Sequence, residues 1–385
     1  MEIKKIFFIG FCLFLLIISP FLVYSQTNIS TSSWQKVIPS SNLPKEINCK
    51  RSNNNLDITF FKSKYYLAFR TAPTHFASKK TIIYIISSPD LKKWSLEKEI
   101  KLGTDAREPR FCIYKDTLRF LFFESGSSMF QFQPHNIWNS ETVGDGKWSD
   151  LIDTNLPGFV PWRMRIHRDT ILLSAYYGID LYKSGHQGNL RLFKSTDAKN
   201  WTPISEHPQI DVSGAEEGEF IFDSIGNLYA TVRLESEGAL ICTASNNEIN
   251  KWDFVKTKYK YDSALLFLHG NDIYLVSRRN LDGEMDKANP KRKPSFRKKY
   301  NLIRYSFTQK KTALFKFNKT EKSIDWIMDF PSTGDNAFPG IVQIEPNKFL
   351  LFNYTNNPNK KNKIWISGQL GKTNIYYTTI TFSEN

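Results

Sequence analysis

Arginines at the ends of apolar strands are the residues of this sequence best suited to binding chemistry. Five of them open or close runs of hydrophobic residues: Arg70, Arg107, Arg163, Arg233 and Arg278. A guanidinium is costly to bury unpaired, and its planar fork of donors matches a carboxylate in bidentate geometry. Ion pairing with a nearby glutamate explains any one of them. Recurrence at equivalent places favours a shared site, so we expect these arginines to gather around one central hollow that binds an anion.

Carboxylates accompany the arginines and could supply acid and base groups. Asp105 and Glu108 flank Arg107 in an Asp-Ala-Arg-Glu-Pro segment, and Glu217 precedes the strand that Arg233 closes. Positioned carboxyl groups can transfer protons in catalysis. Asp105, Glu108 and Glu217 are therefore the candidate catalytic residues.

Histidine and cysteine give no metal-binding pattern. The six histidines show no His-x-x-x-His spacing, so we expect no catalytic metal and no cofactor. His75 is interpreted as a polar pocket or turn residue rather than a base. Cys49, Cys112 and Cys242 are widely spaced and allow either one disulfide with a free thiol or three buried thiols.

Short β-strands must position these groups. Aromatic residues make up 15% of the chain and favour half-buried pleated surfaces, and no stretch shows helical periodicity. Apolar hairpins recur six times, at about 57–69, 111–123, 165–177, 220–232, 265–276 and 341–354. Six units from residue 51 onward have about 56 residues each, which suits a four-stranded blade, whereas five would have about 67. We predict an all-β, six-bladed β-propeller, with a five-bladed propeller as the alternative.

Two turn segments share the pattern Ser-x-Asp-x-x-x-Trp. They run from Ser88 to Trp94 and from Ser195 to Trp201, and a looser version ends at Trp252. The aspartate of such a turn can accept backbone amide hydrogens, and the tryptophan can pack the turn against the sheet. We expect these residues to hold the fold rather than to bind a ligand.

From about residue 55 to 382 the chain resembles the sialidase-like six-bladed propellers. The two turns are similar to the Asp-box of that superfamily, although each is one residue short and lacks its glycine. The other matching segments are 68–73 followed by His75, 217–222 followed by Arg233, 274–278, and 334–340, which contains Asp335. The resemblance implies a glycoside hydrolase that acts on an anionic sugar.

The resemblance also implies roles for single residues. Arg70, Arg233 and Arg278 would bind the sugar carboxylate, with His75, Arg107, Arg163 and Asp335 as further substrate-binding candidates. Asp105 would be the acid and Glu217 the carboxylate that activates a tyrosine nucleophile.

The nucleophile itself departs from the family. Phe338 stands where the resemblance places a tyrosine, and a phenyl ring cannot act as one. Tyr261 and Tyr354 are further candidates. Without a tyrosine beside Glu217, the site either inverts through a carboxyl pair formed by Asp105 and Glu217 or Glu108, or does not hydrolyse sialosides.

Two other functions fit the same residues. The Asp-x-Arg-Glu-Pro element is also similar to five-bladed arabinanase and invertase-like glycosidases. In that interpretation Asp57 is the nucleophile or base, Glu108 or Asp105 tunes the pKa of its partner, and Glu217 or Glu219 is the acid. The third class is a glycan-binding propeller without catalysis.

Charge and the N-terminal segment set the expected partners and location. The net charge of +14 favours acidic partners. We interpret 1–25 as a secretory signal, 26–50 as an N-terminal segment and 51–385 as one propeller domain, secreted or periplasmic, with an uncleaved N-terminal anchor as the alternative. We expect a monomer with a carbohydrate substrate, no further membrane segment and no nucleic-acid partner. The basic run 287–299 is interpreted as a solvated insertion loop, or as a groove for acidic polysaccharide.

Overall fold

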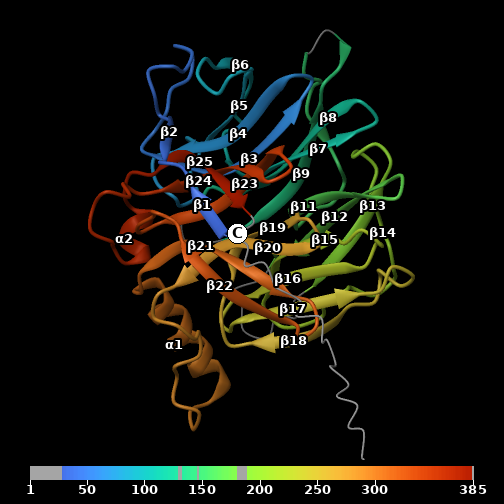
Figure 1. The fold of residues 1–385 in the computed structure, drawn as a ribbon, viewed down its shortest axis with the longest axis vertical. Coiled ribbons are helices and arrows are strands. Elements are labelled where there is room, and N and C mark those ends of the chain that lie inside the picture. The colour runs from blue at the N-terminus through green and yellow to red at the C-terminus, as the bar shows by residue number, and fades with distance from the viewer. Residues whose placement is uncertain (1–27, 129–131, 145–146, 180–188, 384–385) are drawn as a thin grey trace, which may run out of the picture.

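Six antiparallel sheets are arranged around a central axis (Figure 1). The computed structural model describes residues 28–128, 132–144, 147–179 and 189–383. The prediction of an all-β six-bladed propeller is confirmed, and the five-bladed alternative is wrong. The proposed signal, 1–25, lies outside the described residues. Within the described residues, no helix is both long and apolar enough to cross a bilayer.

The first five sheets each contain four strands that follow one another in the chain. The first two are β3 (Ser52–Phe61), β4 (Lys64–Ala72), β5 (Ile82–Ser88) and β6 (Ser95–Ile100), then β7 (Asp105–Tyr114), β8 (Thr117–Ser125), β9 (Pro134–Glu141) and β10 (Ile152–Asp153). The third contains β11 (Phe159–His167), β12 (Thr170–Tyr177), β13 (Leu190–Ser195) and β14 (Thr202–Pro203). The fourth and fifth contain β15 (Ala215–Phe222), β16 (Leu228–Leu234), β17 (Ala239–Ala244) and β18 (Asp253–Thr257), then β19 (Asp262–His269), β20 (Asp272–Asn280), β21 (Lys310–Asn318) and β22 (Ser323–Asp329).

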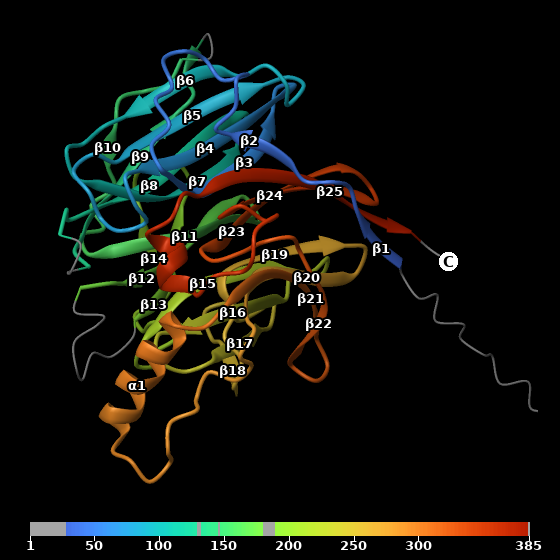
Figure 2. The same ribbon diagram turned by 90° about the vertical axis from the view of Figure 1, so that its left-hand side faces the viewer.

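The sixth sheet joins the two ends of the described chain. It contains β23 (Asn336–Glu345), β24 (Lys348–Thr355) and β25 (Asn374–Ser383), and both β1 (Asn28–Thr31) and β2 (Gln35–Ile38) pair with β25. Figure 2 shows β1 running beside β25. The segment 26–50 thus supplies two strands that close the ring, because backbone hydrogen bonds link the beginning of the propeller to its end.

The apolar core lies between neighbouring sheets. Between the first and second sheets, for example, Ile83 and Ile85 of β5 belong to one buried cluster with Phe120 and Phe122 of β8. Since both faces of a blade are covered by its neighbours, its middle strands are hydrophobic almost throughout rather than alternating. The nearly continuous apolar run of β8, which the sequence shows at 118–123, follows from this burial.

The two Ser-x-Asp turns connect the third and fourth strands of their sheets. Oδ1 of Asp197 accepts backbone hydrogen bonds from Lys199 and Asn200, at 2.8 and 2.9 Å. Asp90 does the same in the first sheet, and Trp94 and Trp201 are buried beneath their turns. Within the described residues, Cys49, Cys112 and Cys242 are free thiols.

One end of the propeller carries the longer connections. In each blade the innermost strand starts at the same end at which the link between the second and third strands lies, because successive strands are antiparallel. Two of these links contain helices: α1 (Pro294–Ser306) in the fifth blade and α2 (Trp365–Gln369) in the sixth. The basic run 287–299 lies in the fifth link, and α1 projects from the blades there (Figure 2).

Candidate active site

All six innermost strands carry a bulge near their first residues. The register of each hairpin shifts between 54 and 56, 107 and 110, 161 and 163, 216 and 219, 262 and 265, and 337 and 340. Five residues inside the bulges have a positive φ, between 39° and 58°: Asn55, Glu108, Glu217, Ser263 and Phe338. This left-handed conformation is uncommon for residues other than glycine and is found at functional sites. A bulge redirects a side chain from the sheet face, here toward the axis.

These five bulge residues line one cavity of about 180 Å³. Arg233, Arg278 and Tyr354 reach the same cavity from the ends of the second strands, and the links contribute His75, Phe132, Trp365 and Gln369. Arg107, Tyr176 and Glu216 complete its wall. The repeated bulge therefore collects groups that are far apart in the chain.

Glu217 is held by two strong donors. Its Oε1 lies 2.6 Å from Nη1 of Arg233, and its Oε2 accepts a 2.6 Å hydrogen bond from the backbone amide of Ser263. Arg233 also lies 3.0 Å from a carboxylate oxygen of Asp262. Arg233 and the backbone amide of Ser263 thereby orient the carboxylate of Glu217 inside the cavity.

Glu216, next to Glu217 in the chain, is in a different environment. It is buried, and this burial raises its pKa to about 8 although Arg233 lies 3.1 Å away. Lys260 is also buried, and its pKa is lowered to about 8 by desolvation and by Arg233. Burial therefore shifts the pKa values of Glu216 and Lys260 in opposite directions, upward for the carboxyl group and downward for the amine.

Glu108 is a second carboxyl group of the cavity whose pKa is raised. Its Oε1 accepts a 3.2 Å hydrogen bond from Asn55, and its Oε2 lies 3.5 Å from Arg110. Burial raises the pKa of Glu108 to about 7; Glu217 adds to this rise and Arg110 opposes it. A carboxyl group with such a pKa can donate a proton at neutral pH.

A second group of hydrogen bonds surrounds Asp335 at the wall of the cavity. Its Oδ2 lies 2.7 Å from Nδ1 of His75, while its Oδ1 accepts hydrogen bonds from Tyr354 at 3.0 Å and Trp365 at 3.1 Å. Burial alone would raise the pKa of Asp335, but His75 and Arg278 lower it. Burial and Asp335 raise the pKa of Tyr354 well above its usual value, so its phenol is neutral.

The structure places six of the sequence-predicted site residues in the cavity wall and four behind it. Those in the wall are Glu108, Glu217, His75, Arg107, Arg233 and Arg278. Asp335 lies one layer behind, against His75 and Tyr354.

Arg70, Asp105 and Arg163 lie in buried ion pairs. Arg70 and Asp105 are both fully buried and 2.7 Å apart, and Arg70 donates further hydrogen bonds to the links beside it. Arg107 bonds the other oxygen of Asp105. Nε of Arg163 lies 2.7 Å from Glu219. Arg70 and Arg163 therefore have the structural role that the sequence left open for any single arginine, which is ion pairing with a nearby carboxylate.

Asp57, Glu219 and Tyr261, which were named for the other interpretations, lie outside the cavity wall. Asp57 accepts a 2.7 Å hydrogen bond from the amide of Phe111, and Glu219 binds Arg163 and Arg165. Tyr261 packs in an apolar cluster between the fourth and fifth sheets. Phe338 does line the cavity, where its ring lies 4.4 Å from the guanidinium of Arg110.

Several wall residues were not among those singled out from the sequence. Asn55, Ser263, Trp365 and Gln369 carry no motif, and Glu216 is the neighbour of a residue that was selected. One sequence signal could have identified two of them. Asn55 and Ser263 lie near the starts of innermost strands, at positions equivalent to those of Glu108 and Glu217.

Comparisons with known proteins find the fold but no sequence family. No protein-family model matches the sequence, and no curated protein matches it. Among solved structures, a protein of unknown function from Dyadobacter fermentans has a TM-score of 0.63 at 13% identity, over 92% of this chain and 99% of that one.

Two enzymes have the same architecture. Trypanosoma rangeli sialidase matches 91% of this chain with a TM-score of 0.61 and 11% sequence identity. Phage phi92 endosialidase matches 92% of this chain with a TM-score of 0.57 and 11% sequence identity. The chain spans 59% of the length of the former and 69% of the latter. At this identity the likeness shows a shared fold, a sialidase-like six-bladed propeller.

Proposed function

We propose that the axial cavity hydrolyses a glycosidic bond of an anionic sugar, with Glu108 as the general acid and Glu217 as the general base. The observation that carries this proposal is that two of the carboxyl groups lining one cavity, Glu108 and Glu217, are in contrasting environments. Burial keeps Glu108 protonated up to about pH 7, whereas Arg233 and a backbone amide hold the carboxylate of Glu217. A carboxyl group with a raised pKa and a second carboxyl group in the same site are the usual acid and base of a glycosidase.

Glu108 replaces Asp105 as the acid in this proposal. Asp105 is fully buried between Arg70 and Arg107; burial alone would raise its pKa, but these arginines lower it. A carboxylate that binds its proton so weakly is a poor acid at neutral pH.

Inversion of configuration is the outcome that this pair favours. Among the described residues Glu217 is hydrogen bonded to Arg233 and Ser263, and Tyr354, one of the two tyrosines that line the cavity, bonds Asp335 instead. A water molecule activated by Glu217 would then attack the sugar while Glu108 protonates the leaving oxygen. Arg107, Arg233 and Arg278 in the wall would bind the sugar carboxylate. We further propose that the protein is secreted or periplasmic.

The test is turnover of aryl sialosides and aryl uronides by the purified protein and by Glu108→Gln and Glu217→Gln. Each substitution should lower kcat by about 10² to 10⁴, because it removes one proton-transfer group. Glu237→Gln, at an exposed glutamate paired with Lys256, is the control and should change nothing. Tyr354→Phe should lower kcat less than about tenfold. Trapping of a covalent sugar on Tyr354 would show instead that this tyrosine is the nucleophile.

A glycan-binding propeller without catalysis is the second candidate. Phe338 at the place of a tyrosine favours it, since the fold family's nucleophile is then missing. Binding of a sialoside or uronide that survives Glu108→Gln, with no turnover by the unmodified protein, would support this second function and exclude hydrolysis. Absence of both binding and turnover would exclude the two together.

A further inference from the structure

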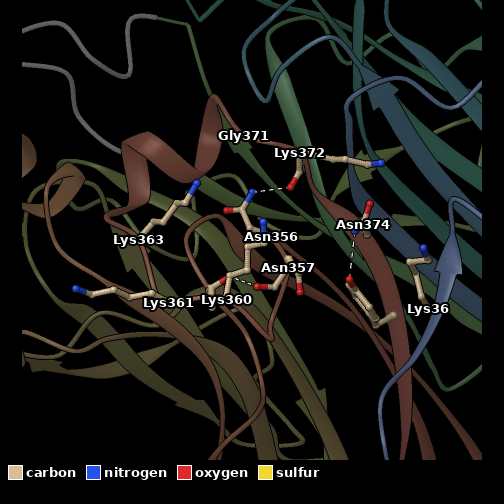
Figure 3. A pocket seen from close by; sticks show the side chains of 11 residues that line it. Lys36, Asn356, Asn357, Lys360, Lys361, Lys363, Gly371, Lys372 and Asn374 are labelled. Atoms are coloured by element: carbon tan, nitrogen blue, oxygen red, sulfur yellow. Dashed lines mark hydrogen bonds between the residues drawn. The ribbon is translucent and has the colours of Figure 1, made fainter.

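A lysine-lined pocket lies beside the axial cavity on the sixth blade. Its volume is about 410 Å³, within the range of sites that hold small ligands. Five lysines line it, from three separate parts of the chain: Lys36, Lys360, Lys361, Lys363 and Lys372. Figure 3 shows Lys361 and Lys363 on one side of Asn356 and Lys36 and Lys372 on the other.

These lysines are not neutralised within the described part of the protein. None of the five forms an ion pair there, and no described aspartate or glutamate lines the pocket. Five like charges around one hollow repel one another, and an anion bound between them would offset this repulsion. A pocket of this kind therefore favours a ligand that carries several negative charges.

Neutral hydrogen-bonding groups accompany the lysines. Asn356 is a buried residue of the lining; its amide nitrogen donates to the carbonyl of Lys372 at 2.8 Å and its oxygen accepts from the amide of Asp335. Asn374 donates to the hydroxyl of Tyr376 at 3.2 Å (Figure 3). Amide and hydroxyl groups among cations suit a polyhydroxylated anion better than a bare phosphate.

One short segment forms a wall of both pockets. In the link between β24 and β25, Trp365 and Gln369 of α2 line the axial cavity, while Lys363, Gly371 and Lys372 line the lysine pocket. A helix of five residues is only about 7.5 Å long. A sugar chain that leaves the axial cavity across α2 would therefore reach the lysines.

We propose that the lysine pocket is a second binding site, which holds an acidic polysaccharide while one of its residues occupies the axial cavity. This inference rests on the proposed function for the identity of the ligand, but the pocket's binding of a carboxylated polymer can be measured without catalysis. The site would give the protein a preference for long anionic chains over single sugars.

The test compares two triple variants that lose the same charge. Lys360→Ser, Lys363→Ser and Lys372→Ser together remove three lysines of the pocket. The matched control is Lys64→Ser, Lys92→Ser and Lys93→Ser, at turns of the first blade on the end opposite the cavity. Binding of polygalacturonate is measured by titration calorimetry in the Glu108→Gln background, with neutral dextran and duplex DNA as comparison polymers.

The pocket variant should bind polygalacturonate about ten to thirty times more weakly than the parent, and the control variant less than about twofold more weakly. In the catalytically intact protein, KM for a single aryl glycoside should stay unchanged in both variants. Equal losses in the two variants would overturn the proposal, because general surface charge would then explain binding. The proposal would also be overturned if duplex DNA bound as tightly as polygalacturonate and lost the same affinity in the pocket variant. Failure of hydrolysis alone leaves the binding result intact.

Discussion

The raised pKa of Glu108 makes the stability of the folded protein depend on pH. A carboxyl group whose pKa rises from its ordinary value of 4.5 to about 7 on folding binds more protons in the folded than in the unfolded state between these two pH values. The stability it contributes is therefore complete below pH 4.5 and is lost as the pH rises through 7. Cavity residues with such a pKa are typical of sites where function opposes stability.

Glu108→Gln should therefore stabilise the protein at high pH only. The free energy of unfolding should increase by about 2 to 3 kcal/mol at pH 8 and stay close to the parent value at pH 4, since glutamine has no proton to lose. Urea denaturation at both pH values measures this, with Glu237→Gln as the control. An equal change at the two pH values would show that Glu108 is not protonated in the folded state.

Arg70 stabilises the fold from behind the cavity. It is fully buried, and it pairs with Asp105, whose other oxygen bonds Arg107. Arg70→Met should lower the free energy of unfolding by about 3 to 5 kcal/mol, because Asp105 remains buried with only part of its charge compensated. Thermal unfolding followed by circular dichroism tests this. Arg51→Met, at an exposed arginine, should have no measurable effect; an undiminished Tm in Arg70→Met would place Arg70 in a solvated position instead.

At the scale of the element, one bulge repeated in six strands builds the site. The bulge residues Glu108, Glu217 and Ser263 have positive φ and share one cavity. A regular strand would direct such side chains to alternate faces of the blade, where the neighbouring sheet excludes charge. The bulge, rather than the regular part of the strand, therefore directs the carboxylates of Glu108 and Glu217 toward the axis.

The Ser-x-Asp turns lie at the end opposite this cavity, so they affect stability alone. Asp197→Ala removes acceptors for the amides of Lys199 and Asn200 and for the hydroxyl of Ser195. The free energy of unfolding should fall by about 1 to 2 kcal/mol. Chemical denaturation measures the loss, and kinetics or ligand binding at the cavity should be unaltered. A change in KM would connect the turn to the site.

At the scale of the whole molecule, strands from the first and last parts of the described chain close the ring. β1 and β2 both pair with β25, so strands separated by more than 300 residues hold the sixth sheet together. Contacts of such sequence separation form only after a large loss of chain entropy. Once formed, they keep the six bulges in one ring, and the geometry of the cavity depends on this closure.

Shortening the N-terminus should loosen the ring in steps. A chain that begins at Asn28 retains β1 and should unfold at the temperature of the full chain. One that begins at Trp34 lacks the four cross-strand pairs of β1 with β25 and should lose about 2 kcal/mol, a Tm shift of only a few degrees for a protein of this size. Calorimetry compares the two. Identical melting of both chains would show that β2 alone closes the propeller.

The sequence by itself determined the architecture and part of the cavity. Six apolar hairpins at a regular spacing predicted six blades, because each blade must bury both faces against its neighbours. Arginines and glutamates at strand ends predicted where polar groups enter the axis, and Glu108, Glu217, Arg233 and Arg278 do line the cavity.

Only the tertiary structure decided which of these groups face the cavity and which are paired behind it. Arg70 and Arg233 look alike in the sequence, since each closes a second strand, yet Arg70 pairs with Asp105 in a fully buried layer while Arg233 reaches Glu217 in the wall. The difference depends on bulge register and on partners from the next blade, such as Ser263 against Glu217. Such contacts join residues dozens of positions apart, and no local pattern of residue types records them.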